Sequence, residues 1–148
     1  MLYIFEAFFV GIYSCIIYSL IIPIIDEYLI TLFVVGFLKH FLGFELSLHS
    51  VYCKFGSACE RSNDRHEYIA KVGWKQLLTE SLLEGCAFMA LGYLFSFLYN
   101  DKLLGVFLIG FTLHNVTEIS GLHHKFCKKR CIRQPMIPLF EPAMFHAT

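Results

Sequence analysis

The chain has 148 residues, a length that fits one domain, and its 12 Lys and Arg balance its 12 Asp and Glu to a formal net charge of zero. A zero net charge gives no bulk attraction to a phosphate backbone, which argues against a nucleic-acid-binding protein. Hydrophobic residues make up 57% of the chain, with 16 Phe and 8 Tyr among them, and the mean hydropathy is +0.60. These values exclude an ordinary soluble domain and are typical of an integral membrane protein.

Four apolar stretches follow one another along the chain. The nearly uncharged runs cover residues 7–25, 28–38, 81–99 and 103–113. With their flanks they predict four membrane-spanning helices, over residues 1–25, 28–44, 77–99 and 103–122. Short polar turns, Asp26-Glu27 and Asn100-Asp101-Lys102, join the spans in two pairs, so each pair must form a hairpin. The first run lacks the basic start and the small-residue cleavage site of a signal peptide, and we expect it to be retained.

An internal repeat relates the two hairpins. The segments Leu29 to Lys54 and Leu103 to Lys128 both contain Gly-Phe, His, Glu, His and Cys in that order, and the distance from Gly to Cys is 17 residues in each. The matched residues are Gly36-Phe37, His40, Glu45, His49 and Cys53 in the first copy, and Gly110-Phe111, His114, Glu118, His123 and Cys127 in the second. Only the Glu is displaced, by one place. The sequence therefore predicts a tandem duplication of a helical hairpin.

The distribution of basic residues predicts how the hairpins are oriented. The central polar segment and the C-terminal segment hold nearly all of the Lys and Arg, whereas the two short turns hold a single Lys. The positive-inside rule therefore places the central segment and both termini on the cytoplasmic side. Both hairpins then enter the membrane from the same side. We expect an all-α integral membrane four-helix bundle made of two tandem, parallel-repeat helical hairpins.

The predicted organisation has four parts: a first hairpin repeat over 1–54, a cytoplasmic-side loop and amphipathic helix over 55–76, a second hairpin repeat over 77–131, and an extended Pro-rich tail over 132–148. We expect the amphipathic helix to begin near Asp64, with Asp64 as the N-cap and Glu67 at the capping-box position. Trp74 is placed where an interfacial aromatic residue is expected. The prolines of the tail favour an extended conformation over a helix.

Ionisable residues recur at one depth of the predicted spans, in their cytoplasmic halves. The candidate cluster comprises Glu6, His40, Glu45, Glu84, His114 and Glu118. A charge in hydrocarbon costs about 2.5–3.5 kcal/mol, so these side chains should face the bundle interior. They could form the hydrogen bonds and salt bridges that dock the hairpins, a transition-metal or proton site, or contacts to lipid headgroups. The spacing of His114 and Glu118 puts them on one helix face, but His40 and Glu45 are five residues apart and diverge, unlike a di-iron motif.

Four of the six cysteines are predicted to lie just outside the membrane on one side: Cys53, Cys59, Cys127 and Cys131. The other two, Cys15 and Cys86, fall inside spans. The four clustered residues could form disulfides, bind zinc or remain free thiols. Their spacings differ from those of a zinc knuckle. The disulfides that we consider are Cys53–Cys127, which would join repeat equivalents, and Cys53–Cys59. A membrane thiol–disulfide protein is a further alternative, although no Cys-x-x-Cys pair is present.

Three stretches, MLYIFEAFFVGIY, GFLKHFLGFELSLHSVYC and GFTLHNVTEISGLHHKFC, resemble a small membrane protein of the nucleocytoplasmic large DNA viruses of eukaryotes. The resemblance covers most of the four predicted spans but not the tail, and it offers no catalytic residues. It implies a location in the internal membrane of the virion, with the termini facing the capsid. It also implies that disulfides can form in the cytosol, because such viruses carry their own oxidases.

The sequence thus predicts a structural protein that links a lipid membrane to a capsid or another membrane-associated protein, with no cofactor expected and an oligomer allowed. An extended apolar tail is suited to a partner's groove, and its candidate contact residues are Pro135, Ile137, Pro138, Leu139, Phe140, Pro142 and Phe145. The alternative is a metal- or proton-dependent membrane enzyme or transporter that uses the buried Glu and His residues. No Ser/His/Asp arrangement, phosphate-binding loop or nucleotide fingerprint favours an enzyme.

Overall fold

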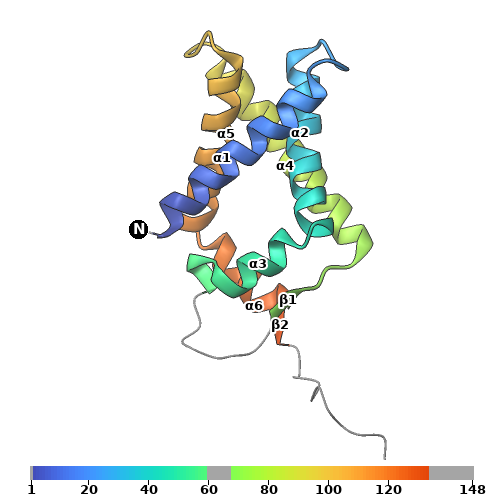
Figure 1. Cartoon of the computed structure of the whole chain (residues 1–148), viewed down its shortest axis with the longest axis vertical. Coiled ribbons are helices and arrows are strands. Elements are labelled where there is room, and N and C mark those ends of the chain that lie inside the picture. Colours follow the sequence, from blue (N-terminus) through green and yellow to red (C-terminus); the bar gives the residue numbers. More distant parts are fainter. Residues whose placement is uncertain (1, 60–67, 134–148) are drawn as a thin grey trace, which may run out of the picture.

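The structure, a computed structural model, describes residues 2–59 and 68–133 (Figure 1). The described residues are mostly helical, which confirms the predicted all-helical class, and they add one short antiparallel ladder in which Tyr68 is paired with Arg133 and Ala70 with Cys131. In chain order the elements are α1 (Leu2–Ile21), α2 (Tyr28–Glu45), α3 (Leu48–Phe55), the 3-10 turn η1 (Ser57–Cys59), β1 (Tyr68–Ala70), α4 (Trp74–Phe95), α5 (Lys102–Ile119), α6 (Leu122–Arg130) and β2 (Cys131–Arg133).

Four of the described helices, α1, α2, α4 and α5, are long and apolar enough to cross a membrane, and they coincide with the four predicted spans. Each consists largely of Leu, Ile, Val, Phe and Ala and contains no proline. Helix α1 ends two residues before Pro23, which cannot continue a helix. Asp101 caps α5, because its Oδ1 accepts hydrogen bonds from the backbone N–H groups of Leu103 and Leu104 at 2.9 and 3.2 Å.

Each long helix packs mainly against a helix of the other hairpin. Helix α2 packs mainly on α4, and α1 packs mainly on α5, so each hairpin contributes one helix to each of the two main packed pairs. Figure 1 shows the α1–α2 turn and the α4–α5 turn at one end of the molecule, and α3, α6 and the short ladder at the other. The core between the helices is formed by fully buried side chains, including Leu32, Val35, Phe88, Val106 and Ile109.

Glycines allow the helices of both pairs to approach closely. A Cβ atom on Gly36 would lie 2.8 Å from the carbonyl oxygen of Glu84, and one on Gly110 would lie 3.2 Å from that of Val10. Gly36 and Gly110 are 74 residues apart, and so are Val10 and Glu84. The α2–α4 and α1–α5 pairs therefore make the same close approach at corresponding positions.

The chain leaves the bundle twice through a left-handed residue, Ser47 with φ 58° and Gly121 with φ 72°. These residues are also 74 positions apart. Each is followed by a short helix, α3 or α6, that runs across the end of the bundle (Figure 1). Left-handed backbone costs little for glycine but is uncommon for serine, which explains why a separate helix α3 was not predicted within the first hairpin repeat.

The segment before α4 differs from the predicted amphipathic helix. Residues 68–70 form strand β1, because they pair with β2, and α4 begins only at Trp74, after Gly73. The expected capping residues Asp64 and Glu67 lie outside the described residues. So does the predicted contact segment of the tail, residues 134–148.

Candidate functional site

The ionisable side chains of the long helices gather near the end of the bundle that α3 and α6 cover. They form two separate clusters, which corrects the single cluster predicted from the sequence. The first, here called the cation-paired cluster, comprises Lys39, His40, Glu80, Glu84 and Arg130. The second, here called the histidine cluster, comprises Glu6, His114, Glu118 and His123.

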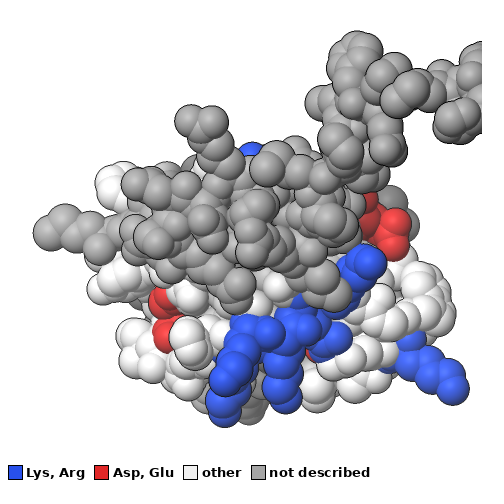
Figure 2. Space-filling model, turned by 90° about the horizontal axis from the view of Figure 1, so that it is seen from below, with Lys and Arg blue, Asp and Glu red and all other residues white. Residues whose placement is uncertain are grey.

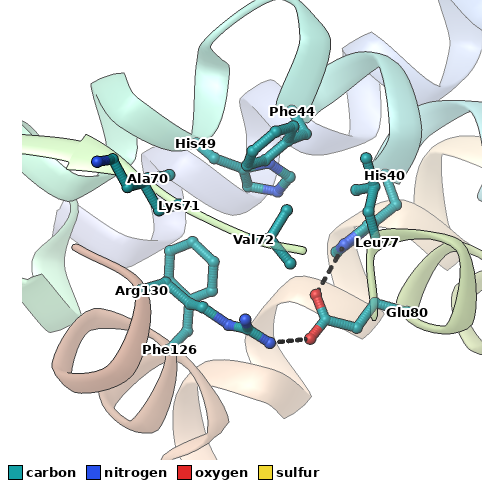
Figure 3. A pocket seen from close by; sticks show the side chains of 10 residues that line it. All are labelled: His40, Phe44, His49, Ala70, Lys71, Val72, Leu77, Glu80, Phe126 and Arg130. Atoms are coloured by element: carbon teal, nitrogen blue, oxygen red, sulfur yellow. Dashed lines mark hydrogen bonds and ion pairs between the residues drawn. The ribbon is translucent and has the colours of Figure 1, made fainter. Parts of the chain in front are cut away.

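In the cation-paired cluster, each carboxylate has a basic partner. Lys39 Nζ forms an ion pair with Glu84, and Arg130 Nη2 lies 2.5 Å from Glu80 Oε1. His40 lies between the two carboxylates, with Nδ1 2.7 Å from Glu84 Oε2 and Nε2 3.5 Å from Glu80 Oε2. Figure 3 shows the Glu80 carboxylate between His40 and Arg130. The charges of this cluster are therefore balanced by the protein's own side chains.

His49, from α3, covers the cation-paired cluster. Its ring centroid lies 5.0 Å from that of His40, and its Nδ1 has no hydrogen-bond partner among the described residues. Burial, with a smaller contribution from neighbouring His40, lowers the pKa of His49 to about 4, so this imidazole is neutral at pH 7. The cavity beside these residues measures only about 10 Å³, space for one water molecule and too small for a substrate.

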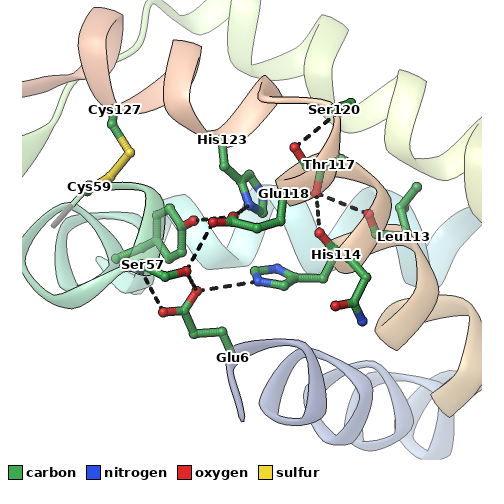
Figure 4. A network of polar contacts seen from close by, with 12 residues as sticks. Glu6, Ser57, Cys59, Leu113, His114, Thr117, Glu118, Ser120, His123 and Cys127 are labelled. Carbon is green, nitrogen blue, oxygen red and sulfur yellow. Dashed lines mark hydrogen bonds and ion pairs between the residues drawn. A yellow bond between two sulfur atoms is a disulfide. The ribbon is translucent and has the colours of Figure 1, made fainter. Parts of the chain in front are cut away.

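In the histidine cluster, two carboxylates from different helices converge on Ser57 (Figure 4). Glu6 Oε1 accepts the Ser57 backbone N–H at 2.8 Å, and Glu6 Oε2 lies 2.9 Å from Ser57 Oγ. Glu118 Oε1 lies 3.1 Å from the same hydroxyl oxygen. A serine hydroxyl has a single proton, so it cannot donate to both carboxylates at once.

The remaining partners in the histidine cluster are imidazoles and a phenol. Tyr52 donates its hydroxyl to Glu118 Oε2 at 3.0 Å, and His123 Nδ1 lies 2.6 Å from the same oxygen. Burial and the neighbouring Glu118 carboxylate raise the pKa of Tyr52, which keeps its hydroxyl protonated as a donor. His114 Nε2 lies 3.6 Å from Glu6 Oε2, beyond hydrogen-bond distance. In the part of the chain that the structure describes, no Lys or Arg forms an ion pair with Glu6 or Glu118.

The two clusters share one geometric plan. The Glu80–His40 and Glu6–His114 contacts measure 3.5 and 3.6 Å, and both the two Glu and the two His are 74 residues apart. Each of these histidines also lies beside a second one, His40 beside His49 at 5.0 Å and His114 beside His123 at 4.6 Å between ring centroids. The clusters differ in their cations and in their second carboxylate. The positions that correspond to Lys39 and Glu84 are Leu113 and Val10, and the position that corresponds to Glu118 is Phe44.

One predicted member of the cluster does not belong to it. Glu45 is exposed at the end of α2 and forms no ion pair with the described residues. Glu118 lies one residue nearer to its histidine than Glu45 does, and this difference turns Glu118 inward.

The cluster predicted from the sequence also left out several members of the two clusters and two of their hydrogen-bond partners. The omitted members are Lys39, Glu80, His123 and Arg130, and the omitted partners are Tyr52 and Ser57. A signal existed for two of them, since Lys39 interrupts an apolar run and His123 belongs to the repeat.

The four cysteines outside the long helices form two crossed disulfides, Cys53–Cys131 and Cys59–Cys127. All four are buried, and Cys59 Sγ lies 3.8 Å from Cys131 Sγ. The first cysteine of each half thus bonds the second cysteine of the other, which differs from both pairings considered from the sequence. Oxidised sulfur atoms are not the thiolate ligands that zinc requires, so this arrangement does not favour zinc at the cysteines. Cys15 and Cys86 are free.

The arrangement can do two things chemically. The cation-paired cluster and the disulfides tie helices and short elements together, while the histidine cluster presents two carboxylates and two imidazoles without an internal Lys or Arg partner among the described residues. No family model matches the sequence, and neither the curated proteins nor the solved structures contain a match.

Proposed function

We propose that the chain is an integral membrane scaffold that anchors a protein partner to a lipid bilayer. The observation that carries this proposal is the distribution of side chains on the four long helices, which is the reverse of that in a water-soluble protein. Large apolar residues face outward, among them Phe5 at 73% exposure, Leu20 at 67%, Leu83 at 65% and Ile119 at 81%, while ion pairs lie between the helices. Such an apolar exterior is stable in lipid and would aggregate in water.

The repeated contacts support a bundle built from two tandem hairpins in parallel orientation. The glycine approaches, the Glu–His contacts and the left-handed exits to α3 and α6 all recur after 74 residues. A two-fold axis along the membrane normal accounts for the exchange of partners between α1, α2, α4 and α5. Both short turns would then lie on one side of the membrane, and α3 and α6 on the other.

The end of the bundle that carries α3, α6, η1 and the β1–β2 ladder is the proposed contact platform. Two disulfides connect its elements, which makes it a rigid surface. Figure 2 views the molecule from this end and shows Lys and Arg side chains gathered on part of the face. Exposed lysines of these elements include Lys54, Lys71, Lys125, Lys128 and Lys129. This basic character favours a cytoplasmic orientation, in which a dedicated oxidase would have to form the disulfides.

A scaffold is a better proposal than an enzyme because the pocket that the ionisable side chains line is too small for a substrate. A larger hollow of about 350 Å³ lies along α1 and α5, but it is open and lined mostly by apolar residues such as Ile12, Leu20 and Phe107. The cavity beside the cation-paired cluster is of water size, and the disulfide sulfurs are buried. The partner is proposed to contact the platform and the tail from residue 134 onward. In a virus with an internal membrane, the partner would be a capsid protein.

Labelling of introduced cysteines tests the membrane topology. Ile24→Cys lies in the α1–α2 turn and Lys128→Cys on α6, and both positions are exposed. In sealed vesicles, a membrane-impermeant maleimide should label only one of the two variants, and after detergent both. The unmodified protein reports the background from Cys15 and Cys86. Labelling of both variants in sealed vesicles would contradict the proposed bundle.

Deletion of residues 134–148 tests the anchoring role. The shortened protein is expected to insert normally and to form both disulfides, but to lose its partner on purification in mild detergent. A matched variant replaces the apolar and proline residues of this segment with Ser at constant length. Unchanged co-purification of the partner with either variant would argue against the tail as the contact.

A further inference from the structure

We propose that the histidine cluster binds one divalent first-row transition metal ion, with His114, Glu118 and His123 as ligands and Glu6 as the fourth. Nitrogen and oxygen donors of this kind suit Zn²⁺ and its neighbours in the series, in contrast to the thiolate ligands of softer ions. This site is independent of the scaffold function and could be present whether or not a partner binds the platform.

The geometry of the donor atoms supports the site. One donor atom each from His114, Glu118 and His123 lies within 4.8 Å of the others. In a tetrahedral site with bonds of about 2.1 Å, donor atoms lie about 3.4 Å apart, so small side-chain rotations would complete the coordination. Figure 4 shows the side chains of Glu6, His114, Glu118 and His123 directed toward one another.

An unpartnered nitrogen points into the same space. His114 is only 8% exposed, and its Nε2 is buried without a hydrogen-bond partner among the described residues. A buried polar atom that lacks a partner costs about 1–3 kcal/mol, and a metal bond would remove this cost. Glu6 Oε2 lies 3.6 Å from this nitrogen, close enough for Glu6 to serve as the fourth ligand.

The surrounding hydrogen bonds hold the ligands in orientation. His123 Nε2 lies 3.1 Å from Thr117 Oγ1, and this contact turns Nδ1 toward Glu118 Oε2, 2.6 Å away. A metal ion bound by both groups would replace this direct contact. The backbone N–H of Ser57 fixes Glu6, and the hydroxyl of Tyr52 fixes Glu118. Metal ligands in proteins are commonly oriented by such hydrogen bonds from the groups behind them.

The charge balance of the histidine cluster favours a cation as the added component. In the cation-paired cluster two carboxylates are neutralised by Lys39 and Arg130, and one of them, Glu80, is the repeat equivalent of Glu6. The histidine cluster brings together two carboxylates with no Lys or Arg partner in the described part of the chain. A divalent ion with two carboxylates and two neutral imidazoles has no net charge, which suits the end of an apolar bundle.

Metal titration of the full-length protein tests the site. Protein purified in detergent without a metal-affinity tag is stripped with a chelator and titrated with Zn²⁺. We expect one equivalent to bind, and Glu118→Gln or His123→Gln to weaken binding about 100-fold or more, since loss of a supporting hydrogen bond alone weakens metal sites by about 10–100-fold. The matched controls are Glu45→Gln at the repeat-equivalent Glu and His124→Gln at the neighbouring His, both exposed and both expected to bind as the unmodified protein does.

Co²⁺ provides a readout that needs no variant. Co²⁺ bound by nitrogen and oxygen should give visible d–d absorption without the near-ultraviolet band of a cobalt–thiolate bond, and reduction of the disulfides should not be required. The proposal is overturned if the folded, unmodified protein takes up neither ion. It is also overturned if a thiolate band appears, or if His123→Gln and His124→Gln bind Zn²⁺ equally.

Discussion

In the cation-paired cluster both carboxylates face a lysine or an arginine, whereas in the histidine cluster they face imidazoles, a phenol and a shared serine hydroxyl. The two regions share one repeated Glu–His contact, of 3.5 and 3.6 Å, whereas their second carboxylates, Glu84 and Glu118, come from positions that do not correspond. Where the chain supplies its own cations, the cluster is a structural tie between helices. Where it does not, the metal ion proposed above would balance the carboxylates.

The largest expected loss of stability comes from removing Lys39, the cation that pairs with Glu84 in the cation-paired cluster. In Lys39→Met the Glu84 carboxylate, 15% exposed, keeps only His40 as a partner. Breaking a buried ion pair on one side costs about 3–5 kcal/mol, because the remaining charge stays desolvated. Reversible unfolding of the detergent-solubilised protein by SDS measures this loss, with the exposed Lys128→Met as the control. A loss below about 1 kcal/mol would show that Glu84 does not depend on Lys39, and the contrast between the two clusters would disappear.

A smaller effect is expected where the two halves are alike. Gly36→Ala and Gly110→Ala should each lower the free energy of unfolding by about 1–3 kcal/mol, because the new methyl group forces the helices of a pair apart. Gly36→Ala should cost more, since its Cβ would lie 2.8 Å from a backbone oxygen, whereas at Gly110 the shortest approach, 2.6 Å, is to the movable hydroxyl of Ser14. The same SDS unfolding measurement serves here.

Gly105→Ala is the matched control for the two glycine variants. Its Cβ would meet only the Tyr28 hydroxyl at 3.4 Å, so the better helix propensity of alanine should leave the protein as stable or more stable. A loss at Gly36 with none at Gly110 would mean that the α2–α4 and α1–α5 contacts are not equivalent.

The long helices were predictable because the nearly uncharged runs 7–25 and 81–99 are each long enough to span a membrane. The shorter runs 28–38 and 103–113 follow them after tight turns and reach spanning length once their flanks are included. The short helices α3 and α6 were less predictable. Gly121 is a recognisable helix stop, and Ser47 occupies the equivalent position of the repeat, but serine by itself gives no signal for a left-handed conformation. Without that exit, α3 could not be predicted, and neither could the contacts that His49 and Tyr52 make from it.

The candidate site was predictable only in part, because the sequence does not show which way each helix turns its side chains. The repeat singled out His40, His114 and Glu118, but their partners depend on how each helix is rotated about its axis. Glu45 looked equivalent to Glu118, and one extra residue in its spacing turned it outward. The disulfide pairing was likewise open, since four cysteines allow three connectivities.

The smallest expected effect is a pH dependence of stability that arises from His49 and distinguishes it from His123, its repeat equivalent. His49 Nδ1 has no hydrogen-bond partner among the described residues, whereas His123 Nδ1 lies 2.6 Å from Glu118. Burial, and to a smaller extent His40, Lys39 and His123, lower the pKa of His49 from 6.5 to about 4, while Glu84 acts in the opposite direction. Between pH 6.5 and about 4, the His49 imidazole is protonated in the unfolded chain but not in the folded protein. The free energy of unfolding therefore falls as the pH drops from 6.5 toward 4, and this contribution is fully present above 6.5.

The test is to measure the free energy of unfolding at pH 7 and again at a pH one unit below the ordinary histidine pKa. The loss attributable to His49 approaches about 1.4 kcal/mol, the value of one pH unit, because only the unfolded chain is protonated over that interval. His49→Phe should remove this part of the pH dependence, and His124→Phe, at an exposed position, should not. If His49→Phe keeps the slope of the unmodified protein, the slope arises from other groups. Its loss would instead show that the cation-paired cluster holds its covering histidine neutral, as a cluster that already contains its own cations should.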